Sequence, residues 1–197
     1  MKKGSEIRRA HYPVDAVFVD RWSPRAMSGA EISEHELLTL FEAARWAPSS
    51  FNAQPWRILY VRRTSRDWAV FLDLLADTNK VWARHAAALV MFVSKKVNDK
   101  TGQSSITHSF DAGAAWGFFA LQAFLKGYVV HGMQGFDYAR AHLELEIPQD
   151  FQVEAMVAVG VPGAKETLPP LLQERETPND RRPLTETVCE GRWALQG

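Results

Sequence analysis

The sequence contains little cysteine, no surplus of either charge and no long apolar run. The single cysteine, Cys189, excludes a disulfide within the chain, which is typical of a reducing compartment. Lysine and arginine together number 23, as do aspartate and glutamate, and this zero balance argues against nucleic acid or an anionic membrane as a partner. The longest apolar run, residues 86–93, is too short to cross a bilayer, and the N-terminus has no apolar signal core. We therefore expect a soluble, cytoplasmic protein with no nucleic-acid or membrane partner.

Metal-binding patterns are missing as well, because the histidines are scattered and none lies at zinc-ligand spacing from the cysteine. Apolar residues, in contrast, are plentiful: they make up 46% of the 197 residues, which favours one globular domain over 1–197. Residues 162–183 carry five of the ten prolines. We therefore expect residues 163–197 to form an extended C-terminal arm that lies across another surface, such as a partner subunit.

The most informative stretch is residues 48–56, Pro-Ser-Ser-Phe-Asn-Ala-Gln-Pro-Trp. It follows a predicted helix that begins after Ser33, which forms a capping box with Glu36, and ends before Pro48. Polar side chains crowd the space between the two prolines and suit a planar ligand with polar edges. A simple capped turn explains the same residues, since serine and asparagine favour turns for local reasons.

The remaining chain alternates between helix and strand patterns. Four strands are predicted at 56–62, 86–94, 128–130 and 151–161, and further helices at 65–77, 79–84, 109–126 and 138–145. Residues 95–107 lack periodicity and predict an exposed loop. Taken alone, this alternation favours a parallel doubly wound sheet. The helix 109–126 is apolar almost all round, which is typical of a core helix or a dimer helix.

Two basic segments are candidate anion sites. Arg21, Ser23 and Arg25 alternate in an extended segment, so all three side chains face one side and Trp22 faces the core. Guanidinium groups bind phosphate through paired N–H donors, and a hydroxyl adds another. Arg181 and Arg182 form a second basic pair near the C-terminus. Solvated surface turns are the alternative interpretation of both segments.

Four segments, taken in their order along the chain, resemble segments of the nitroreductase family. The stretch 48–56 resembles its flavin-binding loop, residues 21–25 its clamp for phosphate and ribityl groups, and Arg181–Arg182 its basic C-terminal segment. The turn 132–135 is similar to the family segment that lies along the flavin ring, whereas His131 beside it is expected to be structural. Trp22 departs from the family, which often has arginine there.

The resemblance implies an α+β fold with a central, mainly antiparallel sheet flanked by helices, and an intertwined homodimer with FMN in two interface sites. It implies hydride transfer from NADH or NADPH through flavin N5 to a small-molecule electron acceptor such as a nitroaromatic compound or a quinone, with no catalytic side chain. The loop 95–107 would border the mouth of the site. The cofactor-binding residues it implies are Arg21, Ser23, Arg25, Pro48, Ser49, Ser50, Asn52, Met133, Gln134, Gly135, Arg181 and Arg182.

Other functions fit the same residues. A flavin-binding protein without turnover and a dimeric structural module are alternatives of a different class. Dehalogenation, flavin fragmentation and azoline oxidation are alternatives on the same scaffold. A yellow protein that NAD(P)H bleaches without oxygen would distinguish the oxidoreductases from the binding and structural proteins.

Overall fold

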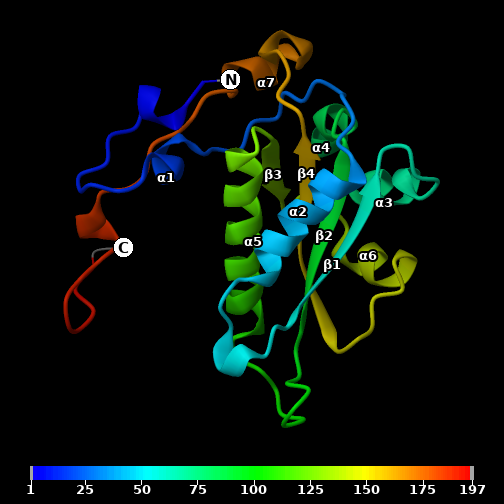
Figure 1. Cartoon of the computed structure of the whole chain (residues 1–197), viewed down its shortest axis with the longest axis vertical. Helices are drawn as coiled ribbons and strands as arrows, with labels where there is room; N and C mark the ends of the chain where they lie inside the picture. The colour runs from blue at the N-terminus through cyan, green and yellow to red at the C-terminus, as the bar shows by residue number, and fades with distance from the viewer. Residues whose placement is uncertain (1, 196–197) are drawn as a thin grey trace.

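A four-stranded antiparallel sheet forms the centre of the computed structural model, which describes residues 2–195 (Figure 1). The strands are β1 (Trp56–Arg62), β2 (Ala88–Lys95), β3 (Val129–Met133) and β4 (Phe151–Gly160). They lie in the order β1-β2-β4-β3, and each neighbouring pair is antiparallel. The α+β fold is confirmed, and the parallel sheet that the bare alternation favours is wrong for the described strands.

Helices cover both faces of this sheet. The α-helices of the described chain are α1 (Ala16–Asp20), α2 (Glu34–Arg45), α3 (Trp68–Leu74), α4 (Asp77–Ala83), α5 (His108–Leu125), α6 (Tyr138–Glu144) and α7 (Pro170–Glu174), of which α1 and α7 lie in the end segments and do not cover the sheet. Helices α2 and α5 pack on one face, whereas α3, α4 and α6 pack on the other. Strand β2 is therefore buried on both sides, with Leu89 and Met91 in one core cluster and Val90 and Phe92 in the other.

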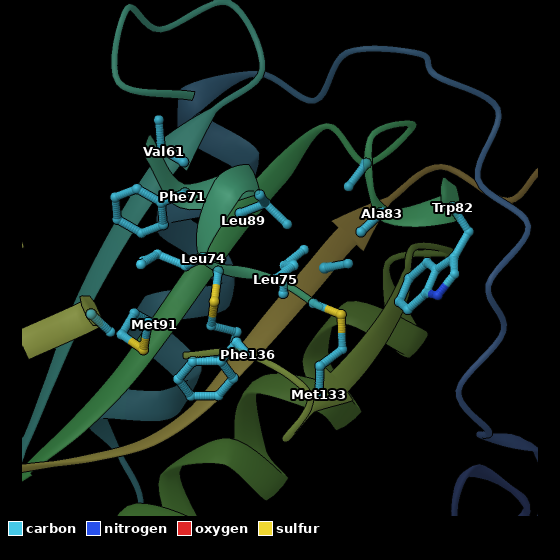
Figure 2. Close-up of a cluster of buried hydrophobic side chains, with 14 of the residues drawn as sticks. Val61, Phe71, Leu74, Leu75, Trp82, Ala83, Leu89, Met91, Met133 and Phe136 are labelled. Atoms are coloured by element: carbon cyan, nitrogen blue, oxygen red, sulfur yellow. The ribbon is translucent and has the colours of Figure 1, made fainter. Parts of the chain in front are cut away.

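The cluster under α3 and α4 is shown in Figure 2. Trp82 of α4 and Met91 of β2 lie in it, together with Met133 at the end of β3 and Phe136 from the segment after it. Their side chains converge on the same face of the sheet. This packing fixes where the chain leaves β3, next to the site described below.

Local signals set the bounds of α2 and β1. The Ser33 hydroxyl accepts a hydrogen bond from the Glu36 N–H at 3.2 Å, as the capping box predicts. The Glu36 carboxylate instead lies 3.2 Å from Lys126 Nζ, so only half of the box forms. Strand β1 has the predicted bounds, and the predicted loop 95–107 contains only an isolated bridge between Val97 and Ser104.

Tertiary pairing changes two predicted elements. The predicted helix 65–77 is shortened to α3 because Leu75 bridges Phe136 and the Ala76 N–H donates to the Gly135 carbonyl at 2.9 Å. The strand predicted at 128–130 continues to Met133 because β4 pairs with it along its whole length. The residues after Val130 are therefore strand first and turn only beyond Met133.

The two ends of the chain lie side by side, away from the sheet (Figure 1). Arg8 joins them: its side chain is buried and donates to the carbonyls of Asn179, Val19 and Arg21 at 2.7, 2.9 and 2.8 Å. The C-terminal arm contains α7 and short helical turns at Lys165–Thr167 and Leu184–Glu186. Within residues 2–195, no helix combines the length and apolarity needed to span a bilayer.

Candidate functional site

Residues 21–26 form an extended segment whose side chains alternate between two environments. Trp22, Pro24 and Ala26 are buried, whereas Arg21, Ser23 and Arg25 remain partly exposed. The Trp22 indole N–H donates to the Lys2 carbonyl at 2.9 Å, which anchors the inward side. The predicted orientation of Trp22 is confirmed, and both arginines and the serine face the same way.

These three residues line a cavity of about 560 Å³ between the extended segment, β3 and the C-terminal arm. The lining consists of Arg8, Arg21, Trp22, Ser23, Arg25, His131, Arg175, Thr177, Pro178, Asn179 and Arg181. Five of these residues are arginines and none is acidic. The cavity therefore has the donors and the charge to bind a phosphate group.

Burial and neighbouring positive charges lower the pKa of two of these arginines. Burial lowers the pKa of Arg21, and the neighbouring charges of Arg8 and Arg181 lower it further. The pKa of Arg8 is lowered by burial and by Arg181, with Asp180 opposing. Like charges held together disfavour one another, so an anion in the cavity would relieve this repulsion.

His131 of β3 forms the inner wall of this arginine cavity. Burial lowers its pKa to about 4, and the positive charge of Arg25 contributes. Its Nδ1 lies 3.2 Å from the Pro24 carbonyl oxygen, which can only accept, so the neutral ring donates from Nδ1. The ring also packs against Trp82, with centroids 4.8 Å apart. His131 therefore supports the extended segment, in line with the structural role predicted for it.

Only one arginine of the C-terminal pair reaches the arginine cavity. Arg181 lines it and Arg182 does not. Both border a separate hollow with Arg9 and Tyr12. The structure thus distinguishes two residues that the sequence leaves equivalent.

The polar loop after α2 has an unusual backbone. Phe51, Asn52 and Gln54 have φ angles of 51°, 53° and 48°, a region that residues other than glycine seldom adopt. Such conformations persist only where surrounding contacts impose them, and they concentrate at functional sites.

Two hydrogen bonds hold this loop. The Ser50 N–H donates to the buried Asp111 carboxylate of α5 at 3.2 Å, and the Ser49 hydroxyl accepts from the Gln54 N–H at 3.0 Å. Pro48 and Asn52 are exposed beside it. Ser50 and Phe51 also line a hollow of about 550 Å³ with the loop 98–107.

Within one chain, this loop and the arginine cavity lie at opposite ends of the sheet (Figure 1). The Gly163 N–H, just after β4, donates to the Ala26 carbonyl, which places the cavity at the C-terminal end of β4. Lys95 bonds to the Pro55 carbonyl and pairs with Phe151, which places the loop at the other end. The ten residues of β4 span about 33 Å. A single chain therefore does not bring the two predicted halves of the site together.

The turn after β3 lies against α4. The Gly135 carbonyl accepts from the Ala76 N–H at 2.9 Å and from Asn79 Nδ2 at 3.0 Å, and a Cβ on Gly135 would lie 2.8 Å from that nitrogen. The Met133 side chain is in the core, and Gln134 is exposed. This leaves the main chain and the Gln134 side chain as the groups that the segment can offer to a ligand.

Several residues of the site carry no sequence signal of their own. Arg8 belongs to a basic lead-in, and Arg175, Thr177 and Asn179 belong to the proline-rich arm. Asp111 sits inside an apolar helix, and its partner Ser50 is far away in sequence. Among residues 2–195, no three His, Cys, Asp or Glu side chains are grouped to hold a metal ion.

Comparisons of sequence relate the chain to known proteins. A family model described as the nitroreductase family matches residues 19–81. A Streptomyces coelicolor protein named for a proposed NADH dehydrogenase or NAD(P)H nitroreductase activity is 25% identical over 75% of this chain and 82% of its own length.

Solved structures extend the likeness over the whole fold. A crystal structure of an oxidoreductase containing FMN is 45% identical, with a TM-score of 0.93 over 96% of this chain and 97% of that chain. A Desulfovibrio desulfuricans protein, provisionally assigned as a nitroreductase and solved with FMN, has a TM-score of 0.71 at 22% identity. That match covers 93% and 99% of the two chains, and at this identity it shows the fold alone.

Proposed function

Since the chain belongs to the nitroreductase family, we propose that it is an FMN-dependent oxidoreductase that uses NADH or NADPH to reduce an electron-poor acceptor. A nitroaromatic compound or a quinone is the acceptor we expect. When bound, FMN supplies the hydride-transfer chemistry of such enzymes. The residues of the chain itself bind the cofactor, orient it and set the charge around it.

The arginine cavity is the observation that carries this proposal. Arg21, Arg25 and Arg181 would hold the phosphate group, and the Ser23 hydroxyl would add a donor. The structure that is 45% identical contains FMN, which supports the same cofactor here.

We also propose that the chain is a homodimer in which each site is shared. The polar loop of one subunit would then complete the arginine cavity of its partner, since the two lie at opposite ends of β4 within one chain. Pro48, Ser49, Ser50 and Asn52 would meet the flavin from across the interface.

Helix α5 offers a surface for this dimer. Phe110, Phe118 and Leu125 are exposed along it, with residue exposures of 80%, 42% and 67%. Gly113 and Gly117 lie on the same helix, and a Cβ on either would meet nothing within 4 Å. A second helix can approach closely where side chains are this small, and an apolar face of this kind is typical of a protein interface.

A reduction experiment tests the proposed function. The purified protein, loaded with FMN, is titrated with NADH and with NADPH in the absence of oxygen while the flavin absorbance is followed. We expect a yellow protein that one or both nicotinamides bleach, and reoxidation by a nitroaromatic compound or a quinone. Yellow protein that neither nicotinamide bleaches would favour a flavin-binding protein without turnover. Protein that stays colourless with added FMN would contradict the proposal.

The acceptor panel separates the related chemistries. Adding a halogenated aromatic compound to the panel tests dehalogenation against nitro and quinone reduction. Reoxidation by the halogenated compound alone would move the assignment from nitroreductase to dehalogenase.

A further inference from the structure

The extended segment 21–26 is a thin wall between two cavities. Arg21, Ser23 and Arg25 line the arginine cavity, and Trp22, Pro24 and Ala26 line a second cavity of about 340 Å³. Trp22, Pro24 and Ala26 are buried but also border a cavity, so side-chain packing alone does not fix this backbone. Its position therefore depends on where its N–H and C=O groups are bonded.

Main-chain bonds from the Arg21 N–H to the Val17 carbonyl and from the Gly163 N–H to the Ala26 carbonyl hold the two ends of the segment. Three distant side chains bond to its other groups. Arg8 donates to the Arg21 carbonyl at 2.8 Å, and His131 donates to the Pro24 carbonyl at 3.2 Å. Glu176, from the C-terminal arm, accepts from the N–H groups of Arg25 and Ala26, both at 2.8 Å. Glu176 is thus the side chain that fixes the backbone of Arg25 itself, and its two bonds are of the strong, charge-assisted kind.

The Glu176 carboxylate is buried with only one of its two oxygens hydrogen-bonded. Its residue is 8% exposed, and Oε2 has no hydrogen-bond partner among residues 2–195. A buried polar atom without a partner destabilises the folded state. Replacing buried charges with apolar residues is often neutral or stabilising, so stability alone does not account for a carboxylate here.

We infer that Glu176 is a positioning residue for the phosphate-binding arginines. By holding the N–H groups of Arg25 and Ala26, it fixes the direction from which the Arg25 guanidinium enters the arginine cavity. It touches no ligand itself. The inference rests on the proposed function, because it takes the phosphate of FMN as the group that Arg25 meets.

FMN and riboflavin together provide the test, since riboflavin has the same ring system and lacks the phosphate. Both are titrated into flavin-free wild-type protein and variants, with quenching of flavin fluorescence as the readout. In Glu176→Ala we expect FMN affinity to fall about tenfold to a hundredfold, the usual effect of losing bonds to a charged group. Riboflavin affinity should stay within about twofold of wild type, because Arg25 acts only on the phosphate.

Two further variants sharpen the result. Glu176→Gln keeps an acceptor oxygen without the charge, so its loss of FMN affinity should be smaller than that of Glu176→Ala. Glu174→Ala is the matched control, because Glu174 is an exposed residue of α7 two positions away. Its affinities for both flavins should equal those of wild type.

A second readout needs no flavin. Amide hydrogen exchange over residues 25–26 should be faster in Glu176→Ala than in wild type and unchanged in Glu174→Ala. A parallel loss of FMN and riboflavin affinity, with lower thermal stability, would overturn the inference and leave Glu176 as a fold residue. If Glu176→Ala binds FMN as tightly as wild type does, the inference about Glu176 is wrong and the proposed function stands. If the wild-type protein binds neither flavin, the proposed function is wrong as well.

Discussion

Individual arginines in the arginine cavity have distinct positions, although the sequence presents them as basic pairs. Arg8 is bound to three carbonyls of its own chain, which leaves four cations for a ligand, namely Arg21, Arg25, Arg175 and Arg181. Arg181 and Arg182 are neighbours in sequence, yet only Arg181 lines the cavity. Access to the arginine cavity thus separates two residues of identical chemistry.

The arginine pair supplies a matched prediction. We expect Arg181→Ala to weaken FMN binding about tenfold to a hundredfold, because it removes a charged contact to the phosphate. Arg182→Ala is the control and should change the dissociation constant by less than about twofold. Fluorescence titration of flavin-free protein measures both. Equal losses in the two variants would place Arg182 in the site and show that the arm adopts another arrangement in solution.

His131 predicts a dependence of stability on pH. Its folded pKa of about 4 lies below the ordinary value of 6.5, chiefly because of burial, so below pH 6.5 the unfolded chain takes up the proton first. The free energy of unfolding of the flavin-free protein should therefore fall as the pH drops, by about 2 kcal/mol between about pH 7 and about pH 5 from this group.

The variant His131→Asn isolates this contribution. It removes the titrating group, so its urea-unfolding free energy should vary less with pH than that of wild type. Identical pH profiles for the two proteins would mean that His131 titrates normally in the folded state.

Among the secondary-structure elements, those with strong local signals are predictable from sequence. Strand β1 has the predicted bounds, and α2 begins at its predicted serine cap. Predictions fail where a distant partner decides. Phe136 ends α3 through Leu75, and β4 draws β3 out to Met133.

The same contrast applies to the candidate site. The alternation of Arg21, Trp22 and Ser23 is a local pattern, and the structure agrees with it. Asp111 and Glu176 act on backbone groups 61 and about 150 residues away, so no local pattern reveals them. The predicted cofactor contacts of Met133, Gln134 and Gly135 stay a prediction, which concerns their main chain and the Gln134 side chain.

The exposed face of helix α5 predicts how the subunits assemble. If its exposed apolar face joins two subunits, the double variant Phe110→Glu and Phe118→Glu should be monomeric and should lose FMN, because charge on an interface opposes burial. Leu143→Glu is the control, since Leu143 is 79% exposed on α6, which packs on the other face of the sheet. Light scattering after size-exclusion chromatography reads the assembly state. A dimer that survives the double variant would place the interface elsewhere.

At the scale of the whole molecule, the arginine cavity and the polar loop are two separate candidate regions at opposite ends of the sheet. The arginine cavity draws on residues from both ends of the chain, from Arg8 to Arg181. The polar loop draws on the middle of the chain and is held by Asp111 at the far end of the sheet. Two copies related by a twofold axis can place each loop against the other copy's cavity, because such an interface uses the same surfaces twice.

A mixed dimer tests this arrangement most directly. Arg21→Ala damages the cavity and Asn52→Ala damages the loop, so each homodimer should bind FMN weakly at both sites. A heterodimer of the two variants, purified through two different tags, should contain one undamaged site if cavity and loop come from different subunits. We predict that it binds one FMN per dimer with wild-type affinity. A heterodimer that binds FMN as weakly as both parents would show that each chain builds its site alone, and would contradict the account.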